Sequence, residues 1–304
     1  MRTPRSSGPD RYEDFAPRPP DGTPRTSSWW SWRGCEVHLE RVGDPDAAVR
    51  MILVHGGGGN AAALWPWAAH LAATGAVVTV PDLPGYGRTR VPDPGGVRYP
   101  DWQRLLADLV RAEHDGRPLV VLGASMGGLL AWDTAAATGL AAAVVATCLL
   151  DPREPAVRAR LTRHPLLGRA AGPALRAAAG PMARVRVPVR WVADMRHVAN
   201  DPALVAAVLR DRQGGGGRVP LGWMRSYLES SPAVEPEGHT GTPVLLVHPA
   251  EDRWTPVVVS RPFYDRIAAP KKLVLLEGSG HFPVEQPGFR QMIEAVAGLV
   301  RDVR

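Results

Sequence analysis

Short apolar runs rich in β-branched residues recur along the chain, and helical stretches separate most of them. The runs are too short for buried helices, and glycine, proline or charged residues bound them, as is typical of buried strands. A further segment, residues 35–42, alternates between apolar and polar side chains, which is typical of an edge strand. The buried strands are expected at 50–55, 76–80, 118–123, 142–150, 243–248 and 272–277.

The stretches between these runs have the composition and periodicity of helices. They are expected at 61–74, 101–113, 126–138, 256–267 and 284–300. Strands that alternate with helices predict an α/β fold with a mostly parallel central sheet and helices on both faces. Because such sheets bind ligands beyond the carboxyl ends of their strands, functional residues are expected in the loops that follow the strands.

One part of the chain breaks this alternation. Residues 152–238 contain several prolines, a run of four glycines and helix-like pieces, with one strand candidate, 185–192, that an internal proline weakens. We therefore expect an inserted, mainly helical cap there, between two parts of the core, 31–151 and 239–304. Residues 1–30 are rich in Pro, Arg, Ser and Asp and poor in apolar side chains, so a disordered leader is expected.

Composition excludes several classes of protein. With 304 residues and 45% hydrophobic content, the chain can bury a large core. Its first residues lack the apolar segment of a signal peptide, and its longest apolar run, 140–150, is far shorter than the ~20 residues of a membrane span. A cytoplasmic protein without stable membrane insertion is expected. Cys35 and Cys148 are expected to be reduced, and no Cys/His cluster has metal-ligand spacing.

The formal net charge of +6 is carried almost entirely by arginine, since Lys271 and Lys272 are the only lysines. No basic run is interleaved with aromatic residues, so nucleic-acid binding is not expected. Residues 152–238 hold 14 Arg against seven acids, a difference of +7 that accounts for the charge of the chain. Most simply these arginines solvate helix faces, and the alternative is that they attract an anionic substrate.

The stretch LVVLGASMGG, residues 119–128, places one serine among glycines directly after a buried strand and before a good helix former. A strand–serine–helix turn with glycines beside the serine is typical of a nucleophile elbow, which lifts the hydroxyl above the sheet. A serine hydroxyl needs a histidine base and an orienting carboxylate. Downstream strand ends supply both: Asp252 follows one strand and His281 follows the next, so that Ser125, Asp252 and His281 form a candidate catalytic triad.

In these motifs the chain resembles the α/β-hydrolase superfamily, especially its cap-bearing lipase, esterase and peptidase branches. The resemblance implies that Ser125 attacks an acyl carbon, that His281 moves the proton and that Asp252 orients the imidazole. It assigns the oxyanion-hole N–H groups to Gly57 and Met126, and it implies no organic cofactor and no metal. The motifs are VHGGGGN, PDLPGYGRT, GASMGG, HPAEDRWTP and GSGHFPVEQP, within residues 35–151 and 239–304.

Several assignments within the site have rivals. Gly58 is the alternative second oxyanion donor. The orienting acid has two alternatives, because Glu251 is adjacent to Asp252 and Asp151 follows the preceding strand. By the same resemblance His55 and His248, which also lie at strand ends, are structural, and we expect their ring nitrogens to be hydrogen bonded.

A competing class of function uses the first glycine-rich loop. Gly57-x-Gly59-x-x-Ala62 follows a strand and precedes a helix, and Asp82 lies about twenty residues on, as in a dinucleotide-binding fingerprint. An NAD(P)-dependent oxidoreductase would leave Ser125 and its downstream partners unexplained. A third class is a hydrolase-fold protein that binds a small molecule without turning it over.

The catalytic pattern predicts acyl transfer to water but does not identify the acyl group. Trp65 and Trp67 follow the candidate oxyanion loop and Trp254 follows the candidate acid, which favours an apolar acyl or aromatic substrate although each could be core packing. Trp65, Trp254 and Gly58 are therefore candidate pocket residues. A small-molecule carboxylic ester with a lipid-like acyl group is the first hypothesis. Amide or peptide, lactone and thioester hydrolysis, and acyl transfer, are alternatives on the same triad; the oligomeric state is not indicated.

Overall fold

A computed structural model describes residues 12–161 and 180–304, and its centre is a sheet of eight strands. The strand order is β1-β2-β4-β3-β5-β6-β9-β10. The two strands β1 and β2 run antiparallel to their neighbours, and the other neighbouring pairs are parallel. The bounds are β1 Arg25–Trp32, β2 Cys35–Val42, β3 Val49–Val54, β4 Ala76–Pro81, β5 Leu119–Gly123, β6 Ala143–Ala146, β9 Val244–Pro249 and β10 Lys271–Leu276.

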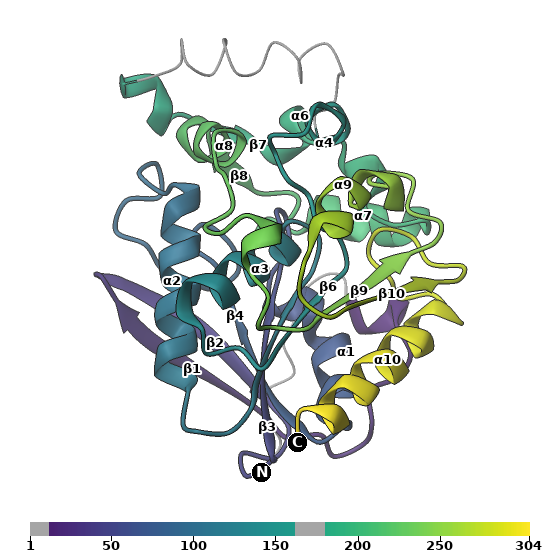
Figure 1. The fold of residues 1–304 in the computed structure, drawn as a ribbon. Helices are drawn as coiled ribbons and strands as arrows, with labels where there is room; N and C mark the ends of the chain where they lie inside the picture. The colour runs from purple at the N-terminus through teal and green to yellow at the C-terminus, as the bar shows by residue number, and fades with distance from the viewer. Residues whose placement is uncertain (1–11, 162–179) are drawn as a thin grey trace.

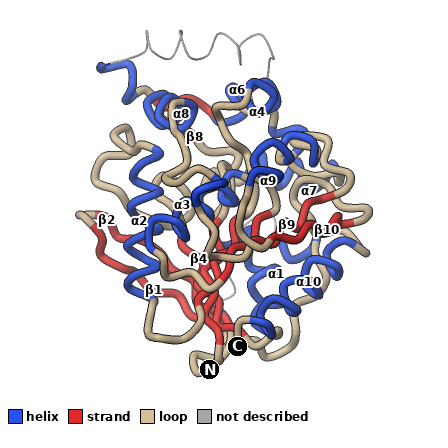
Figure 2. Tube along the Cα trace, in the orientation of Figure 1, coloured by secondary structure: helices blue, strands red, loops and turns tan. Residues whose placement is uncertain are grey.

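Helices cover both faces of this sheet (Figures 1 and 2). On one face, α1 and α10 pack over a buried cluster that includes Trp67 and Met292. On the other face, α2, α3 and α9 pack over a second cluster that includes Trp102 and Trp132. The helix bounds are α1 Ala61–Ala72, α2 Tyr99–Glu113, α3 Met126–Thr138, α9 Arg261–Arg266 and α10 Gly288–Asp302. The predicted fold class, a mostly parallel sheet between two helical layers, is confirmed.

The central strands read as continuous apolar runs because both of their faces are covered. Every residue of β4, β5 and β9 is buried. Burial on both faces removes the polar side chains that would otherwise alternate with apolar ones. The same layering places the loops that follow β3, β5, β9 and β10 together at one edge of the sheet, where the candidate site residues lie.

Residues 152–238 connect β6 to β9, which pair directly in the sheet, and the part of this insertion that the structure describes lies mostly above the carboxyl edge of the sheet (Figure 1). In the described part of this insertion, short helices dominate and a two-stranded antiparallel sheet joins β7 to β8. Its elements are α4 Pro155–Leu161, β7 Arg186–Pro188, α6 Val189–Val192, α7 Pro202–Arg210, β8 Arg218–Pro220 and α8 Leu221–Leu228. Residues 162–179 of the expected cap lie outside the described residues.

The expectation of a disordered leader over residues 1–30 is wrong for the part that the structure describes. Residues Arg25–Trp32 form β1, which pairs along its whole length with β2. The short 3-10 helix η1, Tyr12–Phe15, packs on the body of the protein, and its Tyr12 side chain is 8% exposed. Backbone pairing with β2 orders β1 even though its sequence contains few aliphatic residues. Residues 1–11 lie outside the described residues.

None of the helices in the described residues combines the length and the apolar character that a bilayer crossing needs.

Removing residues 1–29 is expected to destabilise the fold, because the deletion removes η1 and most of β1. The outer edge of β2 would then lose its backbone partner, and Trp32, whose Nε1 donates to Asp108 Oδ2 at 2.9 Å, would no longer be held in a strand. We expect the melting temperature to fall by about 5 °C or more, which corresponds to a loss of roughly 2 kcal/mol. Thermal denaturation of the shortened and full chains measures this, and equal melting temperatures would contradict it.

Candidate active site

Ser125 occupies the sharp turn between β5 and α3. Its backbone has φ 55° and ψ −125°, a conformation that costs a residue with a side chain about 1–3 kcal/mol. The N–H of Ser125 donates a hydrogen bond to Thr147 Oγ1 at 2.8 Å, which ties the turn to the end of β6. The strained turn directs the hydroxyl away from the sheet at its carboxyl edge, so the side chain remains half-buried rather than enclosed.

Two glycines make this turn possible because their neighbours leave no space for a side chain. A Cβ on Gly123 would lie 1.9 Å from the carbonyl oxygen of Gly127, and a Cβ on Gly127 would lie 2.8 Å from that of Val54. Strand β5, the first turn of α3 and strand β3 therefore pack backbone to backbone. This packing explains why glycines accompany Ser125 in the sequence.

The structure brings the three predicted triad residues into one hydrogen-bonded line. The Ser125 hydroxyl Oγ lies 2.8 Å from His281 Nε2, and His281 Nδ1 lies 2.7 Å from Asp252 Oδ2. The loop after β10 carries His281, and the loop after β9 carries Asp252. Both are buried, with 6% and 4% of their surface exposed. This arrangement can move a proton from the serine hydroxyl to the imidazole while the carboxylate holds the ring.

Asp252 is fixed by donors from its own loop. Its Oδ1 accepts the N–H groups of Trp254 and Thr255 at 2.8 Å each, and its Oδ2 accepts the Thr255 hydroxyl at 3.0 Å. The same Thr255 oxygen lies 3.1 Å from His281 Nδ1. Sequence reasoning missed Thr255, although its position three residues after the acid allows this backbone turn.

Asp252 and His281 shift each other's pKa in opposite directions. Burial acts to lower the pKa of His281, but the charge and the hydrogen bond of Asp252 outweigh it and raise the pKa above the ordinary value of 6.5. Burial likewise acts to raise the pKa of Asp252, and the charge and hydrogen bond of His281 outweigh it and hold that pKa well below its usual range. The pair therefore favours an imidazolium next to a carboxylate, which is the state that follows proton transfer from serine.

The two rival acids lie elsewhere. Asp151 forms an ion pair with Arg153, whose guanidinium lies 2.7 Å from its carboxylate. Glu251 is exposed, and its backbone N–H donates to the Ser279 carbonyl at 3.0 Å. Of the three acids considered, Asp252 is the one whose carboxylate contacts His281.

The first glycine-rich loop lies against the serine turn. A Cβ on Gly57 would lie 3.1 Å from Met126 Sδ, and Gly57, Ser125 and Met126 line the same cavity. Met126 opens α3, where the first N–H groups have no acceptor within the helix. Gly58 has φ +82°, and a Cβ on it would meet Met195 and Gly215 of the insertion at 3.0 and 3.2 Å. The predicted oxyanion donors therefore lie beside the serine, and Gly58 faces the insertion.

Asp82 has a structural role that leaves no place for a nucleotide. Its Oδ1 accepts the N–H of Ala61 at 2.7 Å at the start of α1, and its Oδ2 binds His38 Nδ1 at 2.8 Å and the N–H of Arg88 at 2.8 Å. The Asn60 side chain caps the same helix by accepting the N–H of Ala63. Protein groups thus occupy the helix terminus where the dinucleotide hypothesis would put a phosphate.

The two strand-end histidines differ from each other. His55 has both nitrogens paired: Nδ1 lies 2.7 Å from the Gly56 carbonyl, and Nε2 accepts the N–H of Leu83 at 3.0 Å. His248 Nδ1 lies 2.9 Å from the Pro249 carbonyl, but its buried Nε2 has no hydrogen-bond partner among the described residues. The expectation of fully bonded rings is met for His55 and is wrong for His248.

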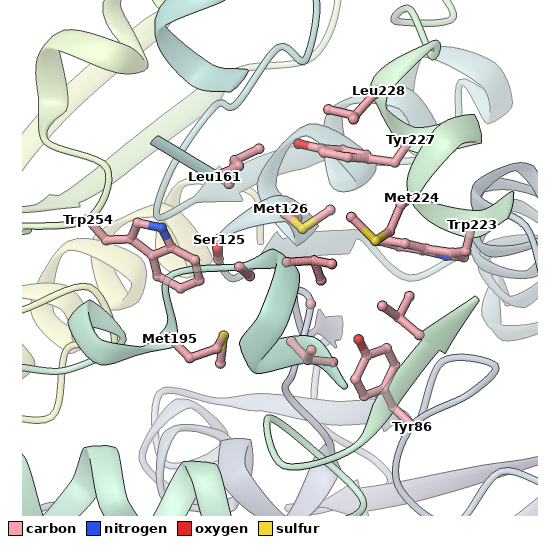
Figure 3. A pocket seen from close by; sticks show the side chains of 15 residues that line it. Tyr86, Ser125, Met126, Leu161, Met195, Trp223, Met224, Tyr227, Leu228 and Trp254 are labelled. Atoms are coloured by element: carbon pink, nitrogen blue, oxygen red, sulfur yellow. The ribbon is translucent and has the colours of Figure 1, made fainter. Parts of the chain in front are cut away.

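Above Ser125 lies an apolar cavity of about 660 Å³, part of which is open to solvent and which we call the cap-side cavity (Figure 3). Most of its walls come from the insertion. In Figure 3, Ser125 lies between Trp254 on one side and Met126 on the other. The other large side chains that line the cap-side cavity are Tyr86, Leu161, Met195, Trp223, Met224, Tyr227 and Leu228. Sequence reasoning predicted Trp254 here and missed the insertion residues, because short irregular segments give no periodic signal.

A second cavity of about 550 Å³, part of which is open to solvent and which we call the loop-side cavity, lies on the histidine side of the serine. Gly57, Ser125 and Trp254 line both cavities. His281 lines the loop-side cavity and does not line the cap-side cavity. The other lining of the loop-side cavity includes Tyr12, Gly58, Ala63, Leu64, Trp67 and Phe282. Ser125 therefore lines both cavities.

The prediction that Trp65 lines the pocket is wrong. Trp65 is partly buried in the same cluster as Trp67, the Arg25 guanidinium lies 4.3 Å from its ring centre, and it lines neither cavity. Trp67, two residues further along the helix, faces the loop-side cavity and stacks on Phe282 with ring centres 5.2 Å apart. The direction of each side chain depends on the rotation of the helix, which the composition of the segment does not reveal.

No arginine is among the described residues that line either cavity. Described cap arginines bind nearby acids or carbonyls, as Arg153 does with Glu235 and Arg225 with Glu229. Three arginines of the expected basic cap, at 163, 169 and 176, lie outside the described residues. The described cavity walls thus favour neutral apolar groups over anionic ones.

Among the described residues, one group of side chains has atoms close enough to hold a metal ion. Cys148, Asp252 and His281 offer ligand atoms that lie within 4.8 Å of one another. Two of these atoms, His281 Nδ1 and Asp252 Oδ2, already bond to each other, and the Cys148 thiol lies 4.0 Å from that carboxylate oxygen. The hydrogen-bonded line from Ser125 to Asp252 accounts for these residues, and we assign them no metal.

A protein-family model described as alpha/beta hydrolase family matches residues 51–290, a span that includes Ser125, Asp252 and His281. The chain belongs to the alpha/beta hydrolase family. Among its curated relatives, a monoacylglycerol lipase of Mycolicibacterium smegmatis is 28% identical over 84% of this chain and 89% of its own length. The pimeloyl-[acyl-carrier protein] methyl ester esterase of Neisseria meningitidis is 29% identical over 86% of this chain and 79% of its own length.

Solved structures of similar shape show the same alpha/beta hydrolase fold. A soluble variant of monoglyceride lipase from Saccharomyces cerevisiae superposes with a TM-score of 0.74 at 16% identity, covering 93% of this chain and 98% of its own. A monoacylglycerol lipase of Paleococcus ferrophilus gives a TM-score of 0.70 at 18% identity, covering 88% of this chain and 100% of its own.

The histidine of this alpha/beta hydrolase is expected to titrate above pH 6.5, because Asp252 stabilises its protonated form. Asp252→Asn removes that charge, so the pKa of His281 should fall by one unit or more, which corresponds to about 1.4 kcal/mol or more. NMR titration of the His281 ring in both proteins measures the change. His55 provides the control, because burial lowers its pKa and Asp252 does not contact it. An unchanged His281 pKa in the variant would contradict the coupling.

Proposed function

We propose that the protein is a serine hydrolase that cleaves carboxylic esters with an apolar acyl group through an acyl-enzyme. The observation that carries this proposal is the line Ser125–His281–Asp252 at hydrogen-bond distances, with a cavity on either side of the serine. The two curated relatives named above, a lipase and a methyl ester esterase, support an ester substrate.

The first half of the reaction forms the acyl-enzyme. Ser125 Oγ attacks the carbonyl carbon as its proton passes to His281 Nε2, and the imidazolium is stabilised by Asp252. The negative oxygen of the tetrahedral intermediate is bound by the backbone N–H groups of Gly57 and Met126, which lie beside the serine. When the intermediate collapses, His281 returns the proton to the leaving alkoxide, and the acyl group stays on Ser125.

The second half repeats these steps with water. His281 takes a proton from a water molecule as the water attacks the acyl carbon, and it then returns a proton to Ser125 as the acid leaves. The cap-side cavity suits the acyl chain because its large side chains are methionines, aliphatic residues and aromatic residues. Amide, lactone and thioester substrates would use the same steps, and an ester and amide panel with a common acyl group separates these alternatives.

A fluorophosphonate probe is expected to label the protein at Ser125, because the strained turn presents the hydroxyl next to its base. Ser125→Ala should abolish labelling and lower kcat on a chromogenic ester by roughly a million-fold, as loss of the nucleophile does in other serine hydrolases. Mass spectrometry of the labelled peptide identifies the site. A folded protein that takes up no probe, or takes it up at another serine, would contradict the proposal and favour a binding protein without turnover.

The orienting role of Asp252 predicts a large loss of activity from a change of a single atom. Asp252→Asn should lower kcat by roughly ten-thousand-fold, because the amide holds the wrong imidazole tautomer and does not stabilise the imidazolium. The matched control is Asp151→Asn, which changes an acid bound to Arg153 and should stay within about tenfold of the wild type. The reverse ranking of the two variants would show that Asp151 is the functional acid.

A further inference from the structure

The position of His281 distinguishes the roles of the two cavities, given the proposed ester hydrolysis. The proton on His281 Nε2 must reach the oxygen of the departing alcohol, so the alcohol lies on the histidine side of the serine. His281 lines the loop-side cavity and does not line the cap-side cavity. The loop-side cavity therefore receives the leaving group, and the cap-side cavity receives the acyl chain.

One wall of the loop-side cavity comes from the segment that precedes the sheet. Tyr12, in η1, lines this cavity and is 8% exposed. Its hydroxyl donates a hydrogen bond to Asp211 Oδ2 at 2.9 Å. The same oxygen accepts from Asn60 Nδ2 at 2.7 Å, and Asn60 caps α1, the helix after the oxyanion loop.

These bonds hold the Tyr12 ring at a fixed place beside the leaving group. Asp211 belongs to the insertion, directly after α7, so one carboxylate joins the N-terminal segment, the insertion and the start of α1. Phe15 packs against the core from the other end of η1, and the Pro17 carbonyl lies 3.2 Å from His70 Nε2. A ring anchored at its hydroxyl and at its backbone cannot move aside for a larger group at small cost.

We propose that Tyr12 sets the size of the alcohol that this enzyme releases, and that the preferred leaving group is compact and apolar. The other side chains of the loop-side cavity support this class, because Ala63, Leu64, Trp67, Val198 and Phe282 offer apolar surface. Because the Tyr12 hydroxyl is hydrogen bonded to Asp211, the side chain presents its ring to the substrate. Replacing the ring with a small side chain joins its volume to the cavity.

The test compares phenyl and 2-naphthyl esters of one acyl chain, because these alcohols differ in size and resemble each other in chemistry. In Tyr12→Ala, the ratio of kcat/KM for the naphthyl ester to that for the phenyl ester should rise by at least about tenfold over the wild type. Tyr12→Leu should give a smaller rise, and Tyr12→Phe, which keeps the ring but loses the bond to Asp211, should shift the ratio much less than Tyr12→Ala. The rate of deacylation should not change in any of them, because the alcohol has already left.

A matched control acts on the other cavity. Met224→Ala enlarges the cap-side cavity, so it should change the preference for acyl chain length and leave the naphthyl-to-phenyl ratio as in the wild type. Titration of Ser125 with the fluorophosphonate counts active sites, so a loss of folded protein does not alter the ratios. An active Tyr12→Ala enzyme whose ratio stays within twofold of the wild type overturns this inference, as does a Tyr12→Phe enzyme that shifts equally. Failure of the wild type to label would instead overturn the proposed function.

Discussion

The close backbone packing around Ser125 is the constraint on which the site depends. Gly123 and Gly127 allow β5, α3 and β3 to approach each other without intervening side chains, and this approach forces the serine into its strained conformation. The strain is stored in a turn that the buried sheet holds on both sides. Because the hydroxyl is placed by backbone, the loops that carry Asp252 and His281 need only bring their side chains to a point that is already fixed.

The core and the insertion contribute different properties to the site. Loops of the core carry Ser125, His281 and Asp252, together with the glycine-rich loop whose Gly57 lines the same cavity as Ser125. The insertion supplies most of the apolar surface over the serine, through side chains such as Met195, Trp223 and Tyr227. In the proposed function, separate parts of the chain carry reactivity and acyl-chain selection, so the insertion can vary in sequence while the reacting groups stay in place.

The sequence predicts the core well because burial on both faces leaves a clear pattern. The apolar runs that became β3, β5 and β9 mark strand ends, and residues with distinctive chemistry follow those ends: Ser125 after β5 and Asp252 after β9. Contacts between segments that the sequence pattern does not relate to each other are harder to predict. Strand β1 was missed because its partner β2 orders it, and Tyr12 was missed because one aromatic side chain in a polar segment gives no periodicity. In the sequence Thr255 resembles any other loop threonine, and only the structure shows that its hydroxyl contacts both Asp252 and His281.

In the proposed mechanism, the position of Ser125 at the boundary of both cavities affects the fate of the acyl-enzyme. Once the alcohol has left, the loop-side cavity is vacated while the acyl chain still fills the cap-side cavity. By microscopic reversibility, the next nucleophile must approach His281 from the space through which the alcohol departed. In the proposed reaction, the walls of that space, which include Trp67, Phe282 and Val198 of the insertion, would decide how the acyl group is divided between water and a competing alcohol.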